Sequence, residues 1–193
     1  MDILLKKQEA LQKQAFEVIA KLNLREILGK YGEFELVGSI EYGLMTWRDI
    51  DANLIFEKDP SDGEFWKIVK QLFASPEVKS LTIVDNRNQT EENRPRSMYV
   101  GIKHKDNRGE TWKIDLRLIA RDQVTTDKIS KLINEKITEE TRKIILKIKS
   151  QVHDNSKYHI VFSSVDIYEA VLLKEVSNLS GFEEYLSVQG KSL

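Results

Sequence analysis

The stretch LVGSIEYGLMTWRDIDANLIF, Leu36–Phe56, determines the fold class of this chain. It contains the end of an apolar run, a Gly-Ser pair, nine intervening residues and a strand in which acidic and apolar residues alternate. Successive residues of a strand point to opposite faces of a sheet, so Asp49 and Asp51 share one face and the apolar residues share the other. The pattern predicts a core strand that carries two neighbouring carboxylates.

Two neighbouring carboxylates repel each other and raise each other's pKa. A bound cation offsets this repulsion, and carboxylate oxygens favour hard ions such as magnesium. Upstream, Gly38 and Ser39 lie where the chain must turn after a strand. Backbone N–H groups and a hydroxyl in such a turn are suited to an anion such as a phosphate. The stretch therefore predicts a magnesium site beside a phosphate site.

The joint pattern of apolar strand, Gly-Ser, nine-residue spacer and Asp-apolar-Asp resembles the signature of the nucleotidyltransferase superfamily. This superfamily has the polymerase-beta-like fold and includes the antibiotic and minimal nucleotidyltransferases. The resemblance covers Phe34 to Ala120, and it implies a third acid on a later strand. The segment TWKIDLRLIA, Thr111–Ala120, alternates in polarity and supplies Asp115 as that acid.

The resemblance assigns roles to three acids. Asp49 and Asp51 would bridge two magnesium ions. Three carboxylates are a reasonable set of ligands for two such ions. Asp115 would complete the metal site nearest the acceptor hydroxyl and accept its proton. All three acids are thus candidate catalytic residues and metal ligands.

Five further residues are candidates for binding the nucleotide. By the resemblance, Gly38 and Ser39 hold the triphosphate. Arg48, Lys113 and Arg117 are candidates for added positive charge near the phosphates. A basic residue beside an acid on a strand more often forms a surface ion pair, and the sequence leaves that alternative open.

The resulting hypothesis is a magnesium-dependent nucleotidyltransferase that transfers a nucleoside monophosphate from a nucleoside triphosphate, expected to be ATP, to a hydroxyl. The acceptor would be a small molecule, such as an aminoglycoside or lincosamide, or a protein side chain. The alternative is a non-catalytic module of the same fold that senses a nucleotide or binds a partner. A metal-dependent nuclease is a third interpretation, which the Gly-Ser turn and the neutral charge disfavour.

Composition narrows the classes of partner and compartment. The net charge is −1, from 30 basic and 31 acidic residues, so no overall field attracts nucleic acid or a membrane, and we expect neither as a partner. The chain has no cysteine, which excludes a disulfide framework and agrees with a reducing compartment. The charged N-terminus is no signal peptide, and no apolar run approaches the ~20 residues of a membrane span. A cytoplasmic location is expected.

The order of predicted elements indicates an α/β (α+β) protein with a mixed sheet and helices packed on it. A catalytic domain over residues 1–122, including the N-terminal helix, precedes a helical region over 123–193. Predicted strands occupy residues 33–38, 49–56, 79–84, 96–103 and 111–120. Predicted helices occupy residues 2–28, 39–45 and 62–74, and Ser61 with Glu64 has the spacing of a capping box.

The polar loop over residues 85–95 joins two predicted strands, and Arg87, Arg94 and Arg96 lie in or beside it. Closure over a substrate is one interpretation, but a solvated loop is favoured. His104, His153 and His159 are scattered without ligand spacing, so no histidine metal site is expected.

The periodicity of apolar residues predicts several helices in the C-terminal part of the chain. Two are expected between Asp127 and Val152, one begins at a Ser164 cap, and residues 181–186 form a short helical turn. Their basic residues are expected on a solvated face: Arg142, Lys143, Lys147 and Lys149. These helices complete the substrate pocket or form a homo-oligomer interface, and the sequence leaves both open.

Overall fold

The computed structural model describes residues 3–90, 95–124 and 128–193 and divides the chain into two compact units. The sheet unit comprises Leu11–Gly43 and Trp47–Thr125, and the helical unit comprises Met1–Ala10, Leu44–Thr46 and Thr126–Leu193. Within the described ranges, no helix is long and apolar enough to cross a lipid bilayer.

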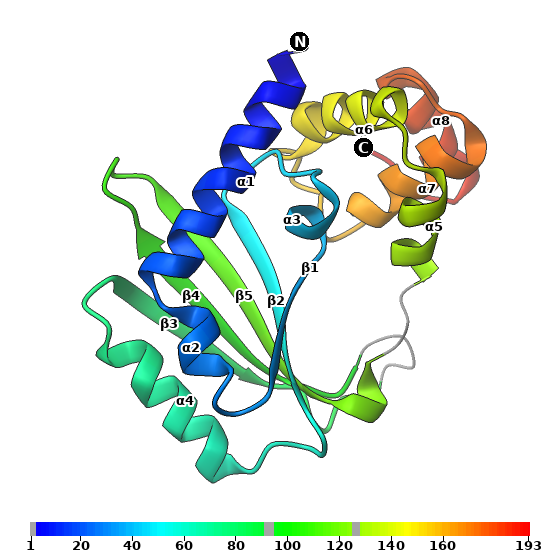
Figure 1. Ribbon diagram of the computed structural model, residues 1–193. Coiled ribbons are helices and arrows are strands. Elements are labelled where there is room, and N and C mark those ends of the chain that lie inside the picture. Colours follow the sequence, from blue (N-terminus) through cyan, green and yellow to red (C-terminus); the bar gives the residue numbers. More distant parts are fainter. Residues whose placement is uncertain (1–2, 91–94, 125–127) are drawn as a thin grey trace. The chain divides into compact units, whose positions relative to one another are not determined.

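The sheet unit is built on five strands in the order β1-β2-β5-β4-β3 (Figure 1). Their bounds are β1 (Glu33–Val37), β2 (Asp49–Phe56), β3 (Val78–Asp85), β4 (Met98–Lys105) and β5 (Thr111–Ala120). β2 and β5 run parallel, while the other neighbouring pairs are antiparallel. The predicted mixed sheet is confirmed, and all five strands were expected within a few residues of these bounds.

Helices cover one face of this sheet. They are α1 (Ile3–Lys21), which belongs to the sheet unit from Leu11 onward, α2 (Leu24–Leu28) and α4 (Asp62–Ala74) (Figure 1). The alternating apolar residues of β2, β4 and β5 form the buried core, including Ile50, Ile102 and Trp112, each 0% exposed. A short 3₁₀ helix, η1 (Arg121–Gln123), follows β5.

Two predicted helices end earlier than expected. The prediction of a single helix over residues 2–28 is wrong, because Asn23 adopts a left-handed conformation at φ 51° and separates α1 from α2. The helix predicted over residues 39–45 is only α3 (Ser39–Tyr42), because Gly43 follows it at φ 64°. A glycine at this position stops a helix because it takes positive φ without strain.

The predicted capping box of α4 is confirmed. The Ser61 hydroxyl accepts a hydrogen bond from the Glu64 N–H at 3.3 Å, and the Glu64 carboxylate accepts one from the Ser61 N–H at 2.9 Å. These bonds satisfy amides that have no partner within the helix.

The helical unit contains α5 (Lys128–Lys136), α6 (Glu139–Val152), α7 (Ser164–Lys174) and α8 (Leu179–Val188). The N-cap of α7 is Ser163, not the expected Ser164, because the Ser163 hydroxyl accepts a hydrogen bond from the Val165 N–H at 3.2 Å. α8 extends beyond the expected residues 181–186, since Asn178 caps it through the Gly181 N–H at 3.0 Å.

Lys149 contradicts the prediction of a uniformly solvated basic face on α6. Its side chain is 1% exposed, and its ammonium group donates to the Leu44 carbonyl at 2.9 Å and to the Tyr168 hydroxyl at 3.2 Å. A buried ammonium group requires such acceptors to offset its loss of hydration. Lys149 therefore belongs to the core of the helical unit.

Candidate metal and nucleotide site

The pairing of β2 with β5 brings three acids together. In the parallel register Asp51 lies opposite Asp115, and Asp49 lies opposite Lys113. Each of Asp49, Asp51 and Asp115 offers a carboxylate oxygen, and these three oxygens lie within 4.8 Å of one another. Asp115, the acid that the sequence placed on a later strand, therefore lies beside the Asp49–Asp51 pair.

The three acids form a partly buried cluster of carboxylates. Burial, and then the charges of Asp49 and Asp115, raise the pKa of Asp51 to about 6, while Arg117 and Lys113 oppose the shift. A carboxylate that is costly to ionise gains most from a neighbouring cation. Three carboxylates that repel one another and each offer an oxygen fit a hard divalent ion such as magnesium.

Lys113 supplies a positive charge at this cluster. Its ammonium group donates to Asp115 Oδ2 at 2.6 Å and lies 4.0 Å from Asp49 Oδ1. Burial lowers the pKa of Lys113, but the hydrogen bond to Asp115 and the charge of Asp49 outweigh it and raise the pKa. For Lys113, the ion pair that the sequence left open as an alternative is present, and it lies at the candidate metal site itself.

The Gly-Ser turn lies directly against the acids. Val37, the residue before Gly38, pairs with Asp51 across β1 and β2. Gly38 has φ 69° and ψ −143°, and a Cβ at this position would lie 3.0 Å from Asp51 Oδ2. Ser39 is the first residue of α3. Only glycine allows both this conformation and this approach to the carboxylate.

The two candidate arginines differ in their surroundings. The Arg48 guanidinium pairs with Glu110 at 3.4 Å, so its partly buried charge is already engaged by that acid. Arg117 lies on β5 opposite Asn53 of β2 and Tyr99 of β4, on the same strand as Asp115. Its charge lowers the pKa of Asp51. Arg117 therefore partly offsets the negative charge of the cluster at Asp51.

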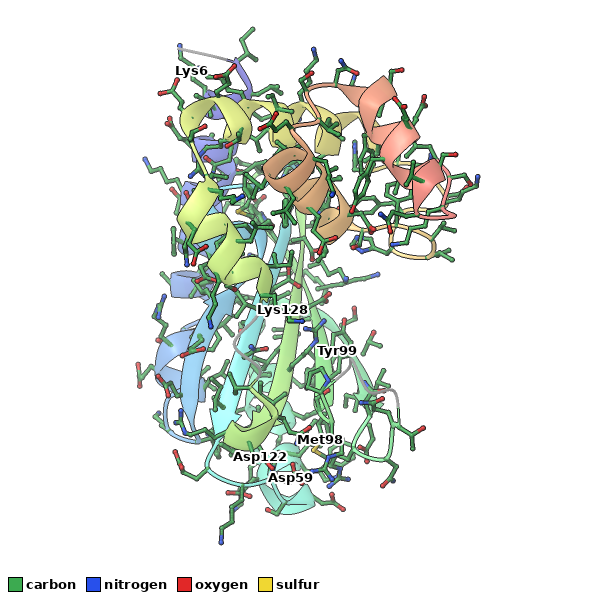
Figure 2. All side chains as sticks on the ribbon, turned by 90° about the vertical axis from the view of Figure 1, so that its right-hand side faces the viewer. Lys6, Asp59, Met98, Tyr99, Asp122 and Lys128 are labelled. Carbon is green, nitrogen blue, oxygen red and sulfur yellow. The ribbon has the colours of Figure 1, made fainter. Side chains whose placement is uncertain are left out.

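Tyr99 is a site residue that sequence reasoning missed. It is labelled on β4 in Figure 2, and its hydroxyl donates to Asp115 Oδ1 at 2.7 Å. Burial, the hydrogen bond to Asp115 and the charge of that acid all raise the pKa of Tyr99, so the phenol stays protonated. The alternation of the predicted strand over residues 96–103 puts Tyr99 on a definite face, but nothing local identifies its partner.

Arg87, the first arginine of the loop after β3, forms two ion pairs with residues that the structure describes. The Arg87 guanidinium pairs with Asp85 at 2.7 Å and with Asp62, at the start of α4, at 2.8 Å. Arg94 lies outside the described residues. The Arg96 N–H donates to the Gln123 side chain at 3.2 Å. Closure of the loop over a substrate stays a hypothesis.

Comparison with solved structures identifies the fold, whereas no family model and no curated protein matches the sequence. The Cid1 poly(U) polymerase superposes with a TM-score of 0.57 and 18% identity, over 88% of this chain and 53% of that chain. A cytoplasmic RNA terminal U-transferase superposes with a TM-score of 0.54 and 17% identity, over 85% of this chain and 54% of that chain. The chain has the nucleotidyltransferase fold.

A third neighbour with the nucleotidyltransferase fold is the STING-associated c-di-GMP synthase CdnE from Capnocytophaga granulosa. It superposes with a TM-score of 0.52 and 14% identity, over 93% of this chain and 67% of that chain. The chain spans about half the length of the poly(U) polymerase and U-transferase chains that it matches. At these identities the similarity establishes the nucleotidyltransferase fold alone.

Proposed function

We propose that this protein is a metal-dependent nucleotidyltransferase that transfers a nucleoside monophosphate from a nucleoside triphosphate, expected to be ATP, to a hydroxyl group. The observation that carries the proposal is the convergence of Asp49, Asp51 and Asp115 within 4.8 Å of one another. The glycine turn against Asp51 and the nucleotidyltransferase fold support it.

The three acids would hold the metal, and two magnesium ions are part of the proposal. When bound, magnesium neutralises charge on the phosphoryl oxygens and makes the acceptor hydroxyl more nucleophilic. The acids are suited to binding a cation. Burial and the acidic neighbours raise the pKa of Asp51 to about 6, and a bound cation would stabilise its ionised form.

The transfer itself requires a bond exchange at the α phosphorus. The acceptor oxygen forms a bond to that phosphorus, the bond to the pyrophosphate oxygen breaks, and pyrophosphate leaves. In our proposal Asp115 receives the proton of the acceptor hydroxyl. Gly38 and Ser39 hold the triphosphate through backbone N–H groups and the serine hydroxyl, while Lys113 and Arg117 balance its charge.

Two classes of hydroxyl acceptor are consistent with the proposed transfer. The small-molecule or protein hydroxyl inferred from the sequence is one of them. The other is the hydroxyl of a nucleotide or an RNA, because the structural neighbours are named as poly(U) polymerase, RNA terminal U-transferase and c-di-GMP synthase. The neutral net charge alone is therefore not a reason to exclude nucleic acid.

Calorimetric titration with ATP, GTP, CTP and UTP, with and without magnesium, tests the proposal. We expect one triphosphate to bind the native protein in a magnesium-dependent manner. The Asp49→Asn/Asp51→Asn variant should bind it at least tenfold more weakly. The matched control is Asp59→Asn, which removes one carboxylate at an exposed site beyond the end of β2 (Figure 2).

The binding experiment also separates the enzyme from its alternative. A preferred triphosphate would then be supplied in α-labelled form with candidate hydroxyl acceptors, and labelled product is expected. Tight binding without transfer to any acceptor class would favour the non-catalytic nucleotide-sensing module. Absence of magnesium-dependent binding of every triphosphate would refute the proposed site. A cytoplasmic location stays a prediction from the sequence.

A further inference from the structure

Tyr99 and Gly101 lie beside Asp115 because of the register of two neighbouring strands. Across the antiparallel β4–β5 pair, Gly101 lies opposite Asp115 and Tyr99 lies opposite Arg117. Residues two apart on a strand share a face, so Tyr99 and Gly101 both belong to the face that carries the acid cluster. This places the phenol diagonally across the strand pair from Asp115, within the reach of a long side chain.

Each oxygen of the Asp115 carboxylate has a separate donor. The Tyr99 hydroxyl donates to Oδ1 at 2.7 Å, and the Lys113 ammonium group donates to Oδ2 at 2.6 Å. Two donors on different oxygens restrict rotation of the carboxylate about its Cβ–Cγ bond. Lys113 is a flexible cation with an exposed side chain, whereas Tyr99 is a half-buried, neutral group on a rigid ring.

Gly101 supplies the space that the phenol occupies. A Cβ at position 101 would lie 2.5 Å from the Tyr99 hydroxyl oxygen and 3.0 Å from Cζ of the ring. No side chain larger than hydrogen fits there unless the phenol moves away. Glycine in the interior of a strand weakens the strand and often marks a close approach of another group. Here the group that approaches is the donor to Asp115.

We propose that Tyr99, seated over Gly101, is a positioning residue that orients the Asp115 carboxylate for metal binding. The inference rests on the proposed function, since it assumes that Asp115 is a metal ligand. Because Tyr99 holds Oδ1, the Oδ2 atom that now accepts from Lys113 would be the oxygen available to a metal. Groups that orient a ligand in this way typically change metal affinity 10–100-fold when they are removed.

Binding of Mn²⁺ alone, without nucleotide, tests this inference through the free-ion signal in electron paramagnetic resonance. We expect Tyr99→Phe, which keeps the ring and removes the hydroxyl, to weaken Mn²⁺ binding about tenfold. The matched control is Tyr31→Phe, a partly buried tyrosine of the same unit outside the acid cluster, and its Mn²⁺ affinity should equal that of the native protein.

A second pair of variants tests the role of Gly101. Gly101→Ala should displace the phenol and weaken Mn²⁺ binding as Tyr99→Phe does. The double variant should lose little more than either single variant, because both changes remove the same hydrogen bond. Urea unfolding of each variant serves as the structural readout. A purely structural role of Tyr99 would lower the unfolding midpoint and leave Mn²⁺ affinity unchanged, and this result would overturn the inference.

The outcomes distinguish this inference from the proposed function. Native-like Mn²⁺ binding by Tyr99→Phe, together with its loss in Asp115→Asn, would overturn the positioning role while the metal site stands. Equal Mn²⁺ affinity of the native protein and Asp115→Asn would overturn the metal site itself, and the positioning role with it. Weaker binding in both Tyr99→Phe and Asp115→Asn, with Tyr31→Phe unchanged, supports both.

Discussion

Burial and neighbouring negative charges act together on Asp51. Its pKa is raised to about 6, first by burial and then by the charges of Asp49 and Asp115. A carboxyl group whose pKa rises on folding makes the folded state less stable once it ionises. The effect is absent below the unfolded pKa, near 3.8, and is complete above about 6. Ionisation of Asp51 therefore lowers the stability of the metal-free protein as pH rises between these two values.

Asp51→Asn removes this ionisation and should stabilise the metal-free protein. The substitution should raise the free energy of unfolding more at pH 8 than at pH 4. We expect the increase at pH 8 to exceed the increase at pH 4 by on the order of 2 kcal/mol. Urea unfolding in the presence of a chelator measures it at both pH values. Asp59→Asn serves as the control and should show no such pH-dependent gain. An equal effect of Asp51→Asn at pH 4 and pH 8 would contradict the assigned electrostatics.

Gly38 shows how closely the turn approaches the acids. Gly38→Ala forces a side chain into φ 69°, with its Cβ 3.0 Å from Asp51 Oδ2. We expect a loss of about 1–2 kcal/mol in the free energy of unfolding and weaker Mn²⁺ binding. Gly63→Ala in α4 is the matched control, because among the described residues the only atom that a Cβ added at Gly63 would approach is the Ser61 hydroxyl oxygen, at 4.0 Å. That control should be neutral or slightly stabilising.

At the scale of elements, α4 begins where its own sequence directs it to begin. The Ser61 hydroxyl both accepts from the Glu64 N–H and donates to the Glu64 carboxylate, at 3.3 Å and 2.6 Å. These contacts span three residues, so they form as soon as the first turn of the helix forms. The start of α4 is consequently a local property of the chain.

Ser61→Ala should destabilise the protein by about 1 kcal/mol, because the first turn of α4 loses its cap. Urea unfolding measures the loss, and amide hydrogen exchange should accelerate first in residues 62–65. Ser75→Ala at the C-terminal end of the same helix is the control, and we expect it to change stability by less than about 0.5 kcal/mol. Equal losses for the two variants would contradict a specific capping role.

At the scale of the whole molecule, the two units are interleaved along the sequence. Leu44–Thr46 belong to the helical unit although they lie between two parts of the sheet unit. Leu44 and Met45 are 0% and 1% exposed, and the Leu44 carbonyl accepts from the buried Lys149 of α6. Division of the chain near residue 122 therefore separates Leu44 from its hydrogen-bond donor.

The fragment 1–122 tests the division into a catalytic domain over residues 1–122 and a helical region over 123–193. We expect it to retain the sheet but to unfold at lower urea concentration than the full chain and to bind a hydrophobic dye, because Leu44 and Met45 lose their cover. Circular dichroism and dye fluorescence provide the measurements. An unfolding midpoint equal to that of the full chain would show that residues 1–122 are an independent domain.

Elements whose signals are local could be predicted from the amino-acid sequence. The strand of Asp49 and Asp51, the glycine turn before it and the capped helix α4 all follow from alternation, turn chemistry and capping within a few residues. The acid pair also pointed to a metal site, because two carboxylates on one strand face need compensation wherever the strand lies.

Contacts between residues that are distant in the sequence could not be predicted in this way and depend on the folded chain. The parallel pairing of β2 with β5 places Asp115 opposite Asp51, and the β4–β5 register brings Tyr99 to the same carboxylate. The burial of Lys149 depends on Leu44 and Tyr168, which are far from it in sequence. Strand order, register and long-range burial arise from packing of the whole chain, and a one-residue change of register would turn each of these strand side chains to the other face.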